Sequence, residues 1–266
     1  MRSERGVTLA ELLIGFALFA IVGVFLAFAF SSATDVWRGV SGDTDAQTTI
    51  NKARFHLSND LRRTSFATVS IGRGTHSLGP TDSDVVWFLS AVDPATGAFL
   101  RKSDGTPFWQ KNILYYAAVP NNHTLLYGFA CTGGPDTEGY DEHCPHKILI
   151  RKVIDKDTAT DPNDETTEET LLLPSDISTY LTRTDQLDSS AMNSEPGVSE
   201  HKIVTTGILG FRADKSPDPR WPDEVQVRLQ STALLSAQRE LSIGNTPLSE
   251  TRFTLDVTLP LYPNMP

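Results

Sequence analysis

The sequence is short of positive charge. Its 266 residues include 23 lysines and arginines against 33 aspartates and glutamates, which gives a formal net charge of −10 and a pI near 5.0. An acidic surface repels phosphate backbones, and no basic cluster interrupts this pattern. The composition therefore argues against a nucleic-acid partner.

Cysteine is also scarce. The only two are Cys131 and Cys144, with twelve residues between them. An even count in an exported domain indicates a disulfide, and closing a loop of about 14 residues is worth ~3 kcal/mol in the chain-entropy model. A reduced pair is the alternative.

The sequence lacks the usual signatures of an enzyme. It contains no nucleophile elbow, phosphate-binding loop or dinucleotide fingerprint. His143, Cys144 and His146 lie together, but their spacing does not match that of structural zinc sites. We therefore expect a protein that is not an enzyme and has no resident cofactor.

One acidic segment keeps a calcium hypothesis open. Asp155, Asp157 and Asp161 supply oxygen ligands of the kind that calcium prefers. The EF-hand pattern would require glycine at the sixth position, where Thr160 stands, and a carboxylate at the twelfth, where Thr166 stands. The alternative is an ordinary solvated acidic loop.

What the sequence does have is one long apolar run near its start. Residues 7–30 contain a single charge, Glu11. As a helix they would span about 36 Å, enough for a hydrocarbon core of about 30 Å. Arg2 and Arg5 precede the run, so the positive-inside rule predicts a cytoplasmic N-terminus and an extracytoplasmic body.

Glu11 distinguishes between three interpretations of this run. A secretory signal peptide would have a shorter apolar core, and a plain membrane anchor would not explain a carboxylate near the end of the span. If the chain is cut between Gly6 and Val7, the new α-amino group lies four residues before Glu11. Amine and carboxylate would then pair within one subunit or between neighbours.

Residues 5–13 read RGVTLAELL and resemble the cleavage and methylation motif of type IV prepilin-like proteins. The departure is Val7, where phenylalanine is commonest. The resemblance implies that a prepilin peptidase of the bacterial inner membrane cuts after Gly6 and methylates the Val7 amine. It also implies that Glu11 places the subunit in a filament with other minor pilins or pseudopilins and a major subunit.

The helix is expected to continue beyond the apolar run. Five apolar residues fall on one helical face, at Ala46, Ile50, Ala53, Leu57 and Leu61. Gly39 and Gly42 predict a bend or break near 39–43, and the helix should end at about residue 66. Its first half would face lipid or the filament, and its second half would pack on the body.

After residue 67, short apolar runs alternate with turn signals, which predicts strands. A long helix followed by strands gives an α+β, pilin-like fold with an antiparallel sheet. Two acidic segments near 155–170 and 185–200 should be solvated, mobile loops around a short element at 171–181. The expected strands are 67–71, 84–91, 110–119, 124–130, 147–154, 203–213, 224–230 and 251–261. The expected organisation is a leader at 1–6, a transmembrane helix at 7–30, an amphipathic continuation at 31–66 and the body at 67–266.

Weaker likenesses point to a subgroup. Residues 55–63 resemble the helix end of J-type minor pseudopilins of type II secretion and of W-type minor pilins, and residues 223–229 resemble their late strand. The function implied is assembly of a secretion pseudopilus or a type IV pilus. The alternative is a membrane-anchored extracytoplasmic binding module or enzyme with no filament role.

Overall fold

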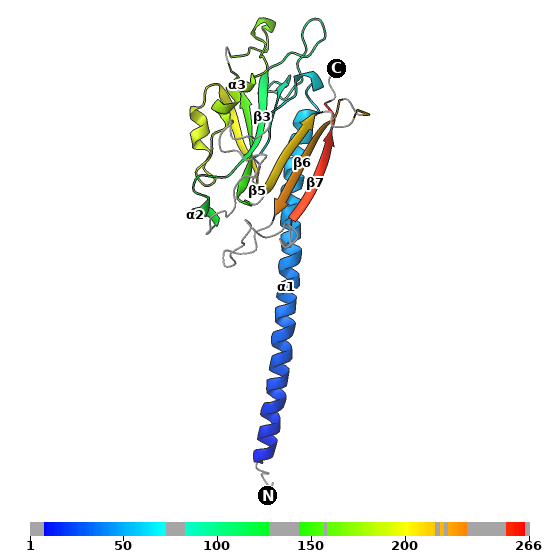
Figure 1. Cartoon of the computed structure of the whole chain (residues 1–266), viewed down its shortest axis with the longest axis vertical. Helices are drawn as coiled ribbons and strands as arrows, with labels where there is room; N and C mark the ends of the chain where they lie inside the picture. The colour runs from blue at the N-terminus through cyan, green and yellow to red at the C-terminus, as the bar shows by residue number, and fades with distance from the viewer. Residues whose placement is uncertain are drawn as a thin grey trace. The chain divides into compact units, whose positions relative to one another are not determined.

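The computed structural model describes residues 8–72, 83–127, 144–156, 159–215, 219–220, 223–232 and 254–263. The chain divides into two units, residues 1–41 and 42–266. Its elements are one long N-terminal helix, a set of antiparallel strands and several short helices (Figure 1). The α+β, pilin-like layout expected from the sequence is confirmed.

Helix α1 runs from Leu9 to Leu61 without interruption. Of the bend or break expected near 39–43, the break is wrong, because a glycine in a helix interior costs only about 1 kcal/mol relative to alanine and no proline accompanies the two glycines. The helix also ends five residues before the expected residue 66. Thr64 turns the chain away, since its hydroxyl donates to the Leu89 carbonyl oxygen at 2.5 Å.

The seven described strands form one antiparallel sheet in the order β1-β2-β3-β4-β5-β6-β7, so neighbours in sequence are neighbours in space. Seven of the eight expected strands are present. The eighth, expected at 124–130, is wrong within its described part: α2 (His123–Tyr127) is helical there. A short apolar run does not distinguish helix from strand. The strands are β1 (Ser70–Gly72), β2 (Val85–Ser90), β3 (Lys111–Ala118), β4 (Lys147–Ile154), β5 (Val198–Lys215), β6 (Val225–Thr232) and β7 (Thr254–Leu261).

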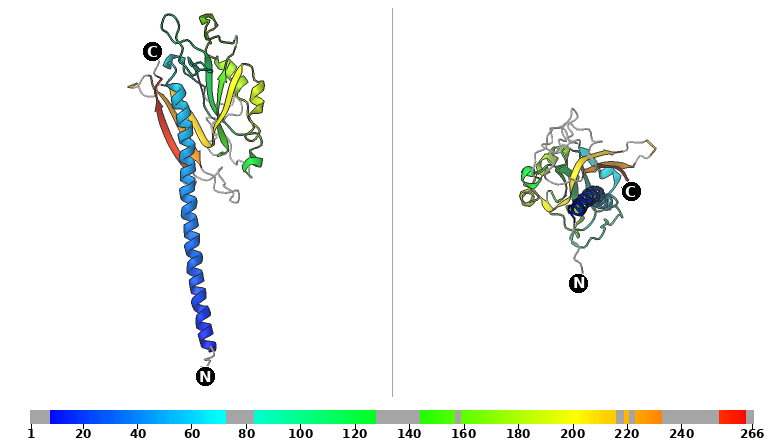
Figure 2. Two further views of the ribbon diagram at one scale, coloured as in Figure 1. Left: turned by 180° about the vertical axis from the view of Figure 1, so that it is seen from behind. Right: turned by 90° about the horizontal axis from the view of Figure 1, so that it is seen from below.

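The C-terminal turns of α1, within residues 42–61, cover one face of this sheet (Figure 2). The expected apolar face is confirmed, since Ala53 and Leu57 have no exposed surface and Ile50 and Leu61 almost none. Asp60 adds a polar anchor at the same place. Its Oδ2 accepts from the Tyr115 hydroxyl and from the Arg151 Nε, each at 2.6 Å.

A long connection between β4 and β5 covers the opposite face of β2–β4. We call residues 156–196 the strap. It contains α3 (Pro174–Ile177) and the short 3-10 helices at Ser178–Tyr180 and Ser190–Ser194. The segments flanking 171–181 are exposed along most of their described length, but the element between them is packed. A second core joins β2–β4 to strap side chains of Leu172, Ile177, Tyr180, Leu181 and Met192.

Polar side chains of the sheet bind the strap through its main chain. Trp87 Nε1 donates to the Leu172 carbonyl at 2.9 Å, Asn112 Nδ2 to that of Thr170 at 2.8 Å, and the Tyr116 hydroxyl to that of Thr182 at 2.8 Å. These bonds satisfy the buried donors of Trp87, Asn112 and Tyr116 at this contact. The two residues that flank the strap are joined where the Asp155 N–H donates to the Gly197 carbonyl at 2.8 Å. We call this contact the neck of the strap.

Candidate functional site

Helix α1 begins with reciprocal hydrogen bonds between Thr8 and Glu11. Thr8 precedes the first helical residue, Leu9, and so occupies the N-cap position. Glu11 Oε2 accepts from the Thr8 N–H at 2.9 Å and from its hydroxyl at 3.0 Å. In return, the Glu11 N–H donates to the Thr8 hydroxyl at 3.3 Å. This arrangement is a capping box.

The capping box gives Glu11 a structural role that reasoning from the sequence missed. A threonine followed three residues later by glutamate, directly before an apolar run, is the sequence signature of this motif. The carboxylate also lies at the positive end of the helix dipole. Glu11 therefore stabilises the first turn of the helix, in addition to any pairing that it makes with the amine of a neighbouring subunit.

Behind this cap, α1 exposes a long apolar surface. The side chains of residues 9–30 are exposed throughout, among them Phe19 at 77% and Phe25 at 71%. Soluble proteins rarely expose so large a contiguous apolar surface. In the described part of the chain, α1 is the one helix long and apolar enough to cross a membrane, judged by length and composition. This surface is consistent with anchoring in the inner membrane.

Residues 1–27 match the family model of the prokaryotic N-terminal methylation motif. The match supports a type IV prepilin-like protein. It implies processing by prepilin peptidase and assembly with other pilins, and it favours a structural subunit over an enzyme. The match ends within the apolar run and does not extend to the body. No curated protein and no solved structure matches the chain.

The residues of the expected processing site, Gly6 and Val7, lie outside the described residues, so cleavage and methylation stay predictions. The same holds for the disulfide: Cys144 is buried, with 1% of its surface exposed, and Cys131 lies outside the described residues. Of the expected N-terminal site, the structure places Glu11 alone.

The calcium hypothesis gains no support from the geometry. Asp155 receives the Lys111 ammonium group as an ion pair and the Thr160 hydroxyl as a hydrogen bond at 3.1 Å. Asp161 accepts instead from Asn163. Among the described residues, no group of three or more histidine, cysteine and acidic side chains is placed to hold a metal. Asp157 lies outside them, and calcium binding stays a prediction.

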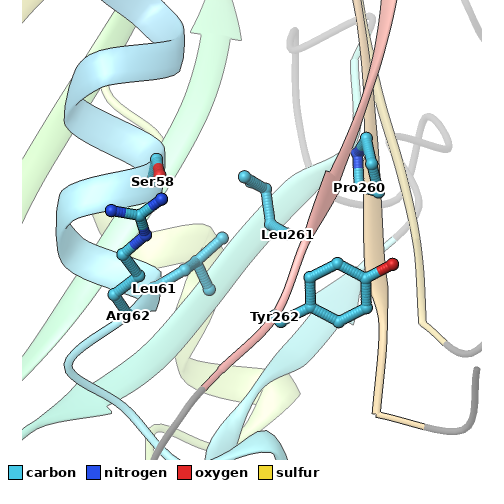
Figure 3. Close-up of a pocket in the computed structure, with 6 residues that line it drawn as sticks. All are labelled: Ser58, Leu61, Arg62, Pro260, Leu261 and Tyr262. Atoms are coloured by element: carbon cyan, nitrogen blue, oxygen red, sulfur yellow. The ribbon is translucent and has the colours of Figure 1, made fainter.

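Two grooves lie beside the last turns of α1 in the body. The larger, of about 260 Å³, has the end of the helix on one side and the end of β7 on the other (Figure 3). The smaller, of about 180 Å³, has charges of both signs, including Asp60, Arg63 and Glu200. Neither lining brings a nucleophile to a histidine or cysteine. The larger is lined by Ser58, Leu61, Arg62, Pro260, Leu261 and Tyr262.

A buried histidine makes the stability of the body depend on pH. His146 has no exposed surface, and its ring centroid lies 5.1 Å from that of His123. Burial, followed by the charges of His123 and Lys147, lowers the pKa of His146 from 6.5 to about 4. Between these two pH values, the unfolded chain therefore binds a proton that the native chain does not bind.

We expect the free energy of unfolding to fall as the pH drops from 6.5 towards 4, by about 2–3 kcal/mol from this residue. Thermal unfolding of the full-length protein in detergent across that range would measure the effect. A His146→Gln variant should show a shallower pH dependence. An unchanged slope in the variant would mean that other groups cause the loss.

Proposed function

We propose that this chain is a minor subunit of a type IV pilus-like filament, either a type II secretion pseudopilus or a type IV pilus. The observation that carries the proposal is the methylation motif at the head of an exposed apolar helix. Prepilin peptidase would cut after Gly6 and methylate Val7. Before assembly the helix would span the inner membrane once, with its N-terminus cytoplasmic and the body periplasmic.

Assembly would move this helix from lipid into contact with other apolar helices. The apolar side chains then contact other apolar helices in place of lipid, so their surroundings change little. A carboxylate near the end of the span, however, still needs a partner. The methylated amine of a neighbouring subunit would supply one, and the pairing would fix the axial position of each new subunit. The body would contact other minor subunits and the major subunit.

The subgroup that we propose is that of J-type minor pseudopilins or W-type minor pilins. Its support is the likeness at residues 55–63, the last turns of α1, and at 223–229. The first stretch includes Asp60, which holds the helix to the sheet through Tyr115 and Arg151. The strap packs on β2–β4, on the side of the sheet opposite the helix.

Two substitutions of Glu11 separate its charge from its role in the helix cap. Glutamine at this position can still complete a capping box, whereas alanine cannot. We expect Glu11→Gln to be inserted and processed normally but to enter filaments poorly. A charge-assisted bond is worth ~1.5–3 kcal/mol, so incorporation should fall about tenfold or more. Glu11→Ala should be at least as impaired.

The measurement is co-isolation of each variant with its filament partners, combined with the intact mass of the membrane-extracted chain. Processing should leave a methylated Val7 as the first residue. Normal incorporation of Glu11→Gln would restrict Glu11 to capping the helix. A natural chain that still begins at Met1 would overturn the filament function and leave a tethered extracytoplasmic module.

A further inference from the structure

Past Phe30, helix α1 keeps one narrow apolar side. Ala33, Val36, Trp37 and Val40 fall within an arc of about 100° on a helix of 3.6 residues per turn. We call these four residues the Trp37 stripe. Val36, Trp37 and Val40 are 67%, 75% and 59% exposed, and Ala33 is exposed as well. The other described side chains of this segment are polar: Ser31, Ser32, Thr34, Asp35 and Ser41.

The stripe lies at a definite distance along the helix. From Leu9 to Trp37 the axis rises about 42 Å at ~1.5 Å per residue. A bilayer measures about 30 Å across its hydrocarbon core and about 40–45 Å with its headgroups. If the Thr8–Glu11 cap lies at the cytoplasmic boundary of the core, residues 9–30 fill the core, and the opposite headgroup layer extends from about 30 to about 37 Å along the bilayer normal. A helix tilt of about 30° brings Trp37 to about 36 Å along this normal, within that layer. Tryptophan is enriched at this level of membranes.

The polar residues around the stripe are compatible with that position. The Thr34 hydroxyl donates to the Phe30 carbonyl oxygen at 2.8 Å, so it brings no unsatisfied donor to the edge of the hydrocarbon. Asp35 is the first charged residue after Glu11, and it projects from the side of the helix away from the stripe. A helix that leaves the bilayer at a tilt turns one side towards the membrane surface, and the apolar arc fits that side.

We propose that the Trp37 stripe binds the phospholipid headgroup region on the periplasmic side of the inner membrane. It would thereby fix the depth of the span while the subunit awaits assembly. This inference rests on the membrane anchoring in the proposed function. The stripe is continuous with the apolar run of residues 9–30, which favours lipid over a neighbouring protein as its occupant.

The test uses the full-length chain in vesicles of phosphatidylethanolamine and phosphatidylglycerol. Bromine atoms, which quench tryptophan fluorescence, are placed either near the headgroups or near the ends of the acyl chains. The difference in fluorescence between the natural chain and Trp37→Phe isolates Trp37 from the other three tryptophans. We expect this difference signal to lose most of its intensity with bromine near the headgroups and little with bromine near the chain ends.

Flotation of the vesicles distinguishes a failure of the membrane anchoring from a failure of the stripe proposal. A chain that fails to float with lipid contradicts the membrane anchoring itself. A chain that floats while Trp37 escapes quenching at both depths overturns the stripe proposal alone. Strong quenching only near the chain ends also overturns it, because Trp37 would then lie in the hydrocarbon. Shielding of Trp37 that develops only after filament assembly would assign the stripe to neighbouring subunits.

Discussion

Replacing Lys152 with methionine should destabilise the body by about 3–5 kcal/mol, because the change leaves a carboxylate buried without its partner. Lys152 has no exposed surface. Its Nζ donates to the Tyr180 carbonyl at 2.5 Å and to the two Glu195 carboxylate oxygens at 2.7 and 2.5 Å. The same ammonium lies 5.3 Å from the centre of the Tyr116 ring. Thermal unfolding of the full-length chain in detergent, followed by near-UV circular dichroism, would measure the loss.

The double variant Lys152→Met/Glu195→Met provides the matched control. Burial lowers the pKa of Lys152 to about 8 even though the bonds to Glu195 raise it, so desolvation outweighs the pairing. Two apolar side chains of similar volume should therefore be tolerated better than either single change. Losses that simply add up in the double variant would show that the two residues do not interact.

Gly197→Ala should cost the body several kcal/mol through a clash at the neck of the strap. Gly197 has a φ of +70°, and a Cβ atom there would lie 2.1 Å from the Asp155 carbonyl oxygen. That oxygen belongs to the main chain, which is held in place because the Asp155 N–H donates to the Gly197 carbonyl. The two chains must separate to admit the methyl group, so the strap should loosen from the sheet. Faster proteolysis within residues 159–196 would report this loosening.

Gly97→Ala measures the cost of the backbone conformation in the absence of a clash. Gly97 has nearly the same φ, +71°, but a Cβ atom there would meet nothing within 4 Å. Its substitution should cost only the left-handed conformation of a non-glycine residue, about 1–2 kcal/mol. Equal losses at the two positions would contradict a steric role for the neck.

The helix and most of the sheet followed from local patterns in the sequence. The spacing of Ile50, Ala53, Leu57 and Leu61 predicted the buried face of α1, and it is buried in the core between helix and sheet. The strap could not be predicted in this way, because its buried residues are irregularly spaced among acids. An indirect signal was present in β2, which is apolar at successive positions and buried along its whole length. A strand of that kind has both faces covered.

At the N-terminal site, the sequence motif alone was enough to single out Glu11. The bonds to Thr8 were equally accessible from the sequence, because they are local and follow from a three-residue spacing. The sequence predicted the charged amine of Val7 as the partner of Glu11, whereas in the structure Glu11 accepts hydrogen bonds from Thr8. The expected break at the two glycines does not occur, because two weak helix formers do not overcome the cooperativity of the turns on either side.

Because helix and strap cover the two broad surfaces of β2–β4 among the described residues, an approaching protein would reach unpaired main-chain groups of the sheet at its two edge strands. One edge strand is β1, just three residues long. The other is β7, where Pro260 lacks an amide hydrogen and Arg228 holds Asp256 in an ion pair at 2.6 Å. Short, proline-bearing and charged borders discourage intermolecular strand pairing. A neighbour must therefore recognise the body through side chains, and point substitutions on its exterior should alter partner choice without altering the sheet.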